Sequence, residues 1–119
     1  MKVTRAKLPT KGQLAALAVA DWCKRNGHPE PNTEYLFAGG LDRRWRFDLA
    51  WPLLASPIAV EINGGGWVNG RHNRGSSLEA EYEKLAHAAA LGWRVIPVTY
   101  GQLDRGELWT WLTMAFATA

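Results

Sequence analysis

The chain alternates between segments with the hydrophobic period of a strand and segments with that of a helix. Leu14, Leu17, Ala18 and Trp22 recur at helical spacing and predict a helix over residues 10–26, which Gly27 would end. Short β-branched and aromatic runs predict strands over residues 33–37, 44–51 and 58–63. A second helix is expected from Ser76 or Ser77 to about Gly92, with the apolar stripe Leu78, Tyr82, Leu85 and Ala89.

Residues 93–99 then predict a buried strand in which Pro97 favours an edge position or a bulge, and residues 106–117 predict a final amphipathic helix. The expected order is α-β-β-β-α-β-α, without a repeat or a linker. A chain of 119 residues with 47% hydrophobic residues fits one globular domain, residues 1–119, of the α/β class.

The prolines at positions 52 and 57 bracket a turn, so the strands on either side are expected to form a hairpin. Pairing them symmetrically about that turn places Trp51 opposite Ile58, Leu49 opposite Val60 and Phe47 opposite Ile62, all on one apolar face. The other face then carries the remaining residues of both strands: Arg46, Asp48, Ala50, Ala59, Glu61 and Asn63.

In this register Asp48 stands directly across from Glu61, and paired residues have Cβ atoms roughly 4.5–5.5 Å apart. Two carboxylates at that separation repel, so a shared proton, an arginine or a divalent cation must offset the repulsion. Small Ala50 and Ala59 would leave room for a ligand, and carboxylate oxygens suit Mg²⁺ or Mn²⁺. The alternative is a solvent-facing sheet on which Arg46 bridges the two acids.

These residues lie in short stretches that resemble the PD-(D/E)XK nuclease superfamily, in particular its small phage and bacterial members. The stretches are residues 44–48, 60–65, 70–75, 83–84 and 92–95, which include Asp48 and the run Glu61-Ile62-Asn63. The resemblance implies a three-layer αβββαβ core with a mixed central sheet, followed here by a C-terminal helix. It also implies that Asp48 and Glu61 bind Mg²⁺, with Mn²⁺ as a possible substitute, for hydrolysis of DNA.

The sequence departs from the family pattern at Asn63, where the superfamily usually has lysine. Lys84 on the following helix is a candidate replacement, although it can equally pair with Glu81 on its own helix. Glu34 is a candidate for the further acid that some members carry ahead of the second strand, or else a charge on an edge strand.

The chain has a formal net charge of +3, and its arginines group in two places. Arg43, Arg44 and Arg46 lie at the predicted strand over residues 44–51, and Arg71 and Arg74 lie in the loop from residue 64 to 75. Both groups are candidates for contacting the DNA backbone. Trp67 in that loop could stack on a base or cover the end of the core. His72 could act as a general acid or base, contact phosphate, or be a surface residue without a role. The candidate DNA-binding residues are therefore Arg43, Arg44, Arg46, Trp67, Arg71, His72 and Arg74.

A nuclease domain this small favours recognition of DNA shape, so the leading expectation is an endonuclease for branched DNA such as Holliday junctions. A twofold homodimer suits paired cuts, and residues 108–112 could form its interface or pack within the monomer. The alternatives are a mismatch- or restriction-type nicking enzyme, an inactive DNA-binding protein with the same fold, and a subunit that binds only protein. No apolar run suggests a membrane span, and the lone Cys23 rules out an intrachain disulfide, so the cytoplasm of a bacterium or of a phage-infected cell is expected.

Overall fold

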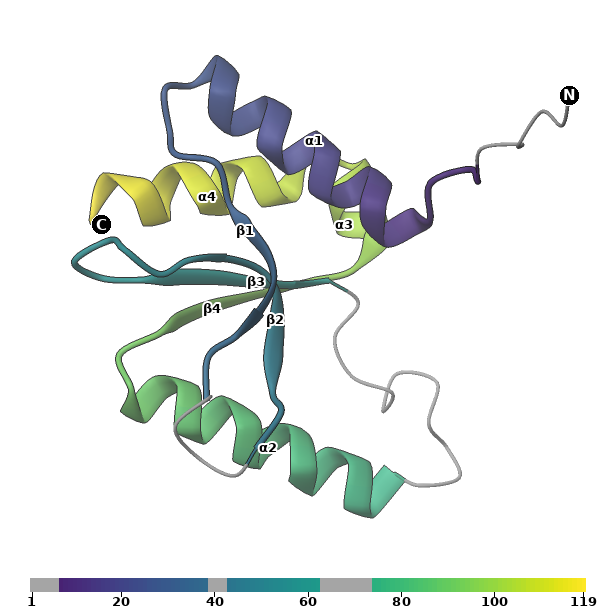
Figure 1. Cartoon of the computed structure of the whole chain (residues 1–119), viewed down its shortest axis with the longest axis vertical. Coiled ribbons are helices and arrows are strands. Elements are labelled where there is room, and N and C mark those ends of the chain that lie inside the picture. Colours follow the sequence, from purple (N-terminus) through teal and green to yellow (C-terminus); the bar gives the residue numbers. More distant parts are fainter. Residues whose placement is uncertain (1–6, 39–42, 63–73) are drawn as a thin grey trace, which may run out of the picture.

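A computed structural model describes residues 7–38, 43–62 and 74–119, with the side chains of residues 74–77 excepted. The described elements follow the order αβββαβαα (Figure 1). They are α1 (Lys11–Arg25), β1 (Asn32–Leu36), β2 (Arg46–Trp51), β3 (Ile58–Ile62), α2 (Arg74–Ala90), β4 (Arg94–Val98), α3 (Tyr100–Asp104) and α4 (Glu107–Ala117). None of the described helices is long and apolar enough to cross a membrane.

Every predicted helix and strand is confirmed to within a few residues, but α3 was not predicted. Thr99 starts this short helix with a capping box, in which its hydroxyl accepts from the backbone N–H of Gln102 and its own N–H bonds the Gln102 side chain. The signal Thr-x-x-Gln was present in the sequence and would have located the helix.

The four strands form one mixed sheet in the order β1-β2-β3-β4. β2 is antiparallel to both β1 and β3, and β4 runs parallel to β3. The pairs Leu49–Val60 and Trp51–Ile58 confirm the hairpin register that the prolines predicted. Pro97 lies on the outer strand β4, where its missing N–H costs no ladder bond.

Helices cover both faces of the sheet, so the fold has three layers (Figure 1). α1, α3 and α4 lie on one side of the sheet, and α2 lies on the other. The larger core cluster joins the first face to α1 and α4 through side chains such as Leu49, Val60, Val19 and Leu112. The smaller cluster lies on the α2 face and includes Phe47, Ala50, Ala59 and Ala88.

The predicted single apolar face of the hairpin is wrong at Phe47. Its ring stacks on Phe37 with centroids 4.0 Å apart, in the cluster on the α2 face, while Leu49 packs on the opposite face. Ala50 and Ala59 are fully buried in the same α2-side cluster, so they leave no room for a ligand. The two-residue alternation of β2 therefore fails between Phe47 and Leu49, at Asp48.

The predicted apolar stripes of the helices also need correction. In α1 the buried residues are Ala15, Val19, Trp22 and Cys23, whereas Leu14 and Leu17 are 53% and 63% exposed. Among the described side chains of α2, Ala88 is the buried one, and Tyr82 is exposed. The larger apolar side chains Leu14, Leu17 and Tyr82 therefore lie outside the core.

The C-terminal segment that was considered for a dimer interface packs within the chain. Leu108 and Leu112 of α4 are fully buried in the larger core cluster, and Trp109 and Trp111 are partly buried against it. These two leucines are therefore not free to meet a second copy.

Leu112→Ala is expected to lower the free energy of unfolding by about 2–5 kcal/mol, because it leaves a cavity in a close-packed core. Met114→Ala on the same helix is the matched control, since Met114 is 64% exposed and its truncation is expected to cost less than about 0.5 kcal/mol. Urea denaturation followed by tryptophan fluorescence measures both. Equal costs for the two variants would contradict the described packing of α4.

Candidate active site

Asp48 lies where the regular pairing of the sheet is interrupted on both of its sides. β1 pairs with Phe47 and Leu49 but not with the residue between them, and the recorded pairing of β2 with β3 stops at Leu49 and Val60. At this point side-chain carboxylates accept hydrogen bonds from backbone N–H groups. Ile62 N donates to Asp48 Oδ2 at 2.7 Å, and Asp48 N donates to Glu61 Oε1 at 3.2 Å. Each of the two carboxylates thus accepts a hydrogen bond from the backbone of the other's strand.

Lys84 reaches this site from α2. Its ammonium Nζ lies 2.6 Å from Glu61 Oε2 and 5.7 Å from the centre of the Phe47 ring. The Glu61 and Lys84 side chains are only 10% and 14% exposed. Of the two alternatives for Lys84, projection toward the site or pairing with Glu81 on its own helix, the structure shows the first, with Glu61 as its partner.

Burial raises the pKa of Glu61 above its ordinary value of 4.5. The hydrogen bond and the charge of Lys84 oppose that rise, the negative charge of Asp48 adds to it, and the N–H of Asp48 lowers the pKa. The repulsion between the two carboxylates is thus offset by Lys84 and two backbone N–H groups.

This arrangement corrects the expected open face. Glu61 is 7% exposed, so it does not stand on a solvent-facing patch of the sheet. Arg46 does not bridge Asp48 and Glu61; its guanidinium binds Glu34 Oε2 at 3.1 Å on the surface.

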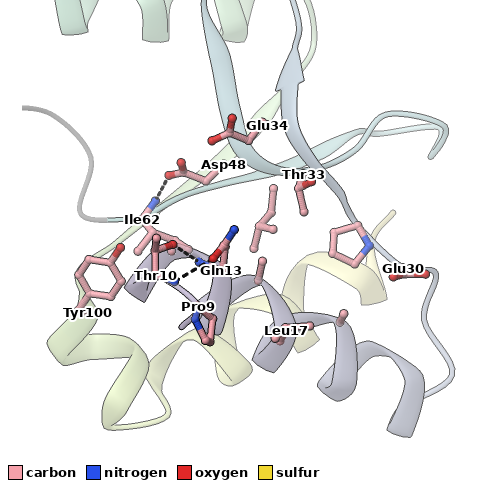
Figure 2. A pocket seen from close by; sticks show the side chains of 15 residues that line it. Pro9, Thr10, Gln13, Leu17, Glu30, Thr33, Glu34, Asp48, Ile62 and Tyr100 are labelled. Carbon is pink, nitrogen blue, oxygen red and sulfur yellow. Dashed lines mark hydrogen bonds between the residues drawn. The ribbon is translucent and has the colours of Figure 1, made fainter. Parts of the chain in front are cut away.

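On its other side Asp48 borders an open cleft of about 710 Å³ between α1 and the strands β1 and β2. Figure 2 shows Asp48, Ile62, Thr10 and Tyr100 toward one end of this cleft and Glu30 at the other. Asp48 is half-buried, and its Oδ1 accepts no hydrogen bond from the described part of the chain. One carboxylate oxygen is therefore open to a ligand from the cleft.

Glu34 lies beside Asp48 at the rim of the cleft (Figure 2). The flanking pairs Thr33–Leu49 and Tyr35–Phe47 place it opposite Asp48 in the β1–β2 register. Its backbone φ of 49° is in the left-handed region, which is unusual for a non-glycine residue inside a strand. Glu34 is close to the site, and in this structure its carboxylate is held by Arg46.

The donor set fits one hard divalent cation only in part. Asp48 offers a free oxygen, whereas both oxygens of Glu61 are engaged, by Asp48 N and by Lys84. Within the described ranges, no three His, Cys, Asp or Glu side chains gather to hold a metal ion. Mg²⁺ commonly binds through one or two carboxylates and keeps several waters. The open oxygen of Asp48 is compatible with one such ligand, whereas Glu61 offers no free oxygen while it binds Lys84 and Asp48 N.

The candidate DNA-binding residues are only partly described. Arg43 binds Glu83 at 2.6 Å and lies 5.0 Å from the Trp45 ring, Arg46 binds Glu34, and Arg44 is exposed. Arg74 begins α2, but its side chain lies outside the description. The remaining DNA-binding candidates, Trp67, Arg71 and His72, lie outside the described residues, as does the catalytic candidate Asn63, and their roles stay predictions.

Sequence reasoning missed the residues that α1 and α3 bring to the cleft, chiefly Thr10, Gln13 and Tyr100. Thr10 and Gln13 form a capping box at the start of α1, a pattern that is visible in the sequence. That pattern locates the helix start but does not reveal that it faces β2.

Comparison of the chain with protein-family models, curated proteins and solved structures finds no match. The resemblance to the PD-(D/E)XK superfamily thus stays a prediction. The interpretation of the site depends on its own geometry.

Proposed function

We propose that the chain is a metal-dependent endodeoxyribonuclease that hydrolyses phosphodiester bonds in DNA. The observation that supports this most is the linked set Asp48, Glu61 and Lys84, placed where β2 and β3 stop pairing and next to an open cleft. A buried carboxyl group with a raised pKa close to a cleft, as Glu61 is here, is typical of catalytic sites. The order αβββαβ of the first elements is also that of the PD-(D/E)XK core.

In this proposal Asp48 and then Glu61 hold Mg²⁺ or Mn²⁺. A bound cation would supply positive charge at the scissile phosphate and would lower the pKa of a water molecule. Lys84 would supply the positive charge that Asn63 cannot, and its ammonium group would become available to an anionic group on leaving Glu61. The buried surroundings of Lys84 strengthen that interaction relative to one in water.

The proposed substrate is branched DNA, with the Holliday junction as the leading case, and the proposed assembly is a homodimer. Exposed Arg44, together with Arg43, Arg46, Arg71 and Arg74, would contact the phosphate backbone. Such contacts make the affinity fall steeply with salt.

A second candidate is a DNA-binding protein that keeps this fold without catalysis. The observation that favours it is the Lys84–Glu61 ion pair, which neutralises Glu61 and occupies the oxygen a metal would need. Asn63 in the place of the usual lysine favours it as well.

The two candidates are separated by incubating the purified chain with linear, nicked, flapped and four-way DNAs in Mg²⁺ or in EDTA. The nuclease is expected to cut in Mg²⁺ and not in EDTA, with the four-way DNA cut fastest. Salt-dependent binding without cleavage in Mg²⁺ or Mn²⁺ would instead support the inactive DNA-binding protein. Absence of salt-dependent binding would exclude both and favour a subunit that binds only protein.

A further inference from the structure

The cleft beside Asp48 has an apolar middle. Ala16, Leu17 and Ala20 of α1 line one wall, and Leu49 and Pro31 lie on the strand side. Its volume of about 710 Å³ is within the range of pockets that hold small ligands. The cleft therefore has apolar walls of a size that can hold a planar group.

The charged side chains that line the described part of the cleft are all carboxylates, and two cations lie at its border, Arg46 on Glu34 and Lys11 over the Tyr100 ring. Glu30, Glu34 and Asp48 border it, and neither lysine nor arginine is among the described residues that line it. A DNA backbone running through the cleft would bring its phosphates against Glu30 and Asp48, and against Glu34, whose charge Arg46 offsets. The charge pattern thus favours a neutral occupant and keeps the phosphates outside, at the end where Asp48 would share a cation with them.

Uncharged hydrogen-bonding groups complete the lining. The Oε1 atom of Gln13 accepts from Thr10 N at 2.8 Å, and the amide Nε2 of Gln13 bonds no atom in the described part of the chain. The hydroxyl groups of Thr33 and Tyr100 also border the cleft. Apolar walls with a few amide and hydroxyl groups match a nucleobase, which has apolar faces and polar edges.

We propose that this cleft takes an unpaired nucleobase of the DNA strand whose phosphate lies at Asp48. This inference rests on the proposed nuclease function and specifies its substrate. A base within a duplex must first be unstacked and unpaired before it can enter, whereas an unpaired base is already free. The protein should therefore prefer DNA with an unpaired nucleotide next to the cut, as occurs at branches, flaps and bulges.

The test compares two variants of α1 that make the same chemical change. Leu17→Glu adds a carboxylate inside the cleft, and Leu14→Glu adds one a turn away on the same helix, outside the cleft. Both leucines are more than half exposed, so both variants are expected to fold. Affinity is measured in EDTA by fluorescence anisotropy for a duplex with one unpaired 2-aminopurine and for the fully paired duplex.

The wild-type chain is expected to bind the DNA with the unpaired base about tenfold more tightly, a factor typical of one well-placed base contact. Leu17→Glu should remove this preference, and Leu14→Glu should retain it. Equal binding of the two DNAs by the wild type would overturn the inference, and so would an unchanged preference in Leu17→Glu. If the preference is present and lost in Leu17→Glu while Mg²⁺ supports no cleavage, the base site holds and the nuclease function fails.

Discussion

Asp48→Asn is expected to lower the rate of Mg²⁺-dependent DNA cleavage on the order of 10³-fold, because a charged metal ligand contributes several kcal/mol to the transition state. The fold should survive, since the asparagine amide oxygen can still accept the N–H of Ile62 that Asp48 Oδ2 accepts now. DNA affinity in EDTA should fall little, because the phosphate contacts come from other residues. Single-turnover cleavage with excess protein measures the effect.

Asp21→Asn is the matched control for this prediction. Asp21 lies on the exposed side of α1 and pairs with Arg25, and its substitution makes the same change in net charge. Its cleavage rate should equal that of the wild type. If Asp48→Asn cuts DNA as fast as Asp21→Asn, Asp48 is not a metal ligand and the proposed nuclease function is wrong.

Lys84→Met is expected to lower the free energy of unfolding by about 3–5 kcal/mol at pH 8, because it leaves the carboxylate of Glu61 buried without its cation. The Glu61 side chain is 10% exposed, so water cannot replace the ammonium group at 2.6 Å. Chemical denaturation in a metal-free buffer measures this loss. It is a large part of the stability of a domain of this size.

The cost of Lys84→Met should depend on pH in a defined direction. Burial already raises the pKa of Glu61 above 4.5, and loss of Lys84 raises it further. A carboxyl group whose pKa is higher in the folded chain stabilises the fold while it is protonated, and that stability is lost as the pH rises through the raised pKa. The variant should therefore approach the wild type near pH 4 and diverge from it toward pH 8.

Adding Glu61→Gln to Lys84→Met supplies the control, because the neutral amide no longer needs a cation. The double variant should recover most of the lost stability at pH 8, and its pH dependence should be flatter. A loss that is equal at pH 4 and pH 8, and that Glu61→Gln does not relieve, would show that Lys84 acts through its packing on Phe47 rather than through its charge.

The strands and the hairpin register could be predicted because two local signals agreed. The prolines at 52 and 57 fixed the turn, and the apolar runs on each side fixed which residues pair. The assignment of faces failed at Phe47 because it assumed unbroken alternation along β2. At Asp48 and Glu61, side-chain carboxylates replace part of the backbone hydrogen-bond ladder. The alternation of apolar and polar residues in the sequence does not indicate such a replacement.

The site could be predicted where its members are close in sequence or in register. Asp48 and Glu61 followed from the hairpin, and Lys84 from its place off the apolar stripe of α2. The burial of Glu61 and the cleft beside Asp48 could not be foreseen, because they depend on how α1 and α2 dock on the sheet. In α1 the buried residues are Ala15, Val19, Trp22 and Cys23, and of these only Trp22 belonged to the predicted apolar stripe.

The two outer strands restrict how copies of this chain can associate. On β4 the amide hydrogen missing from Pro97 breaks the row of donors that another strand would need. β1 forms the opposite edge of the sheet, where the left-handed backbone of Glu34 interrupts the regular strand geometry and its carboxylate adds a charge. A twofold assembly is therefore expected to join through helices or loops rather than through one sheet continuing across two molecules, and neither border offers a template for fibrous aggregation.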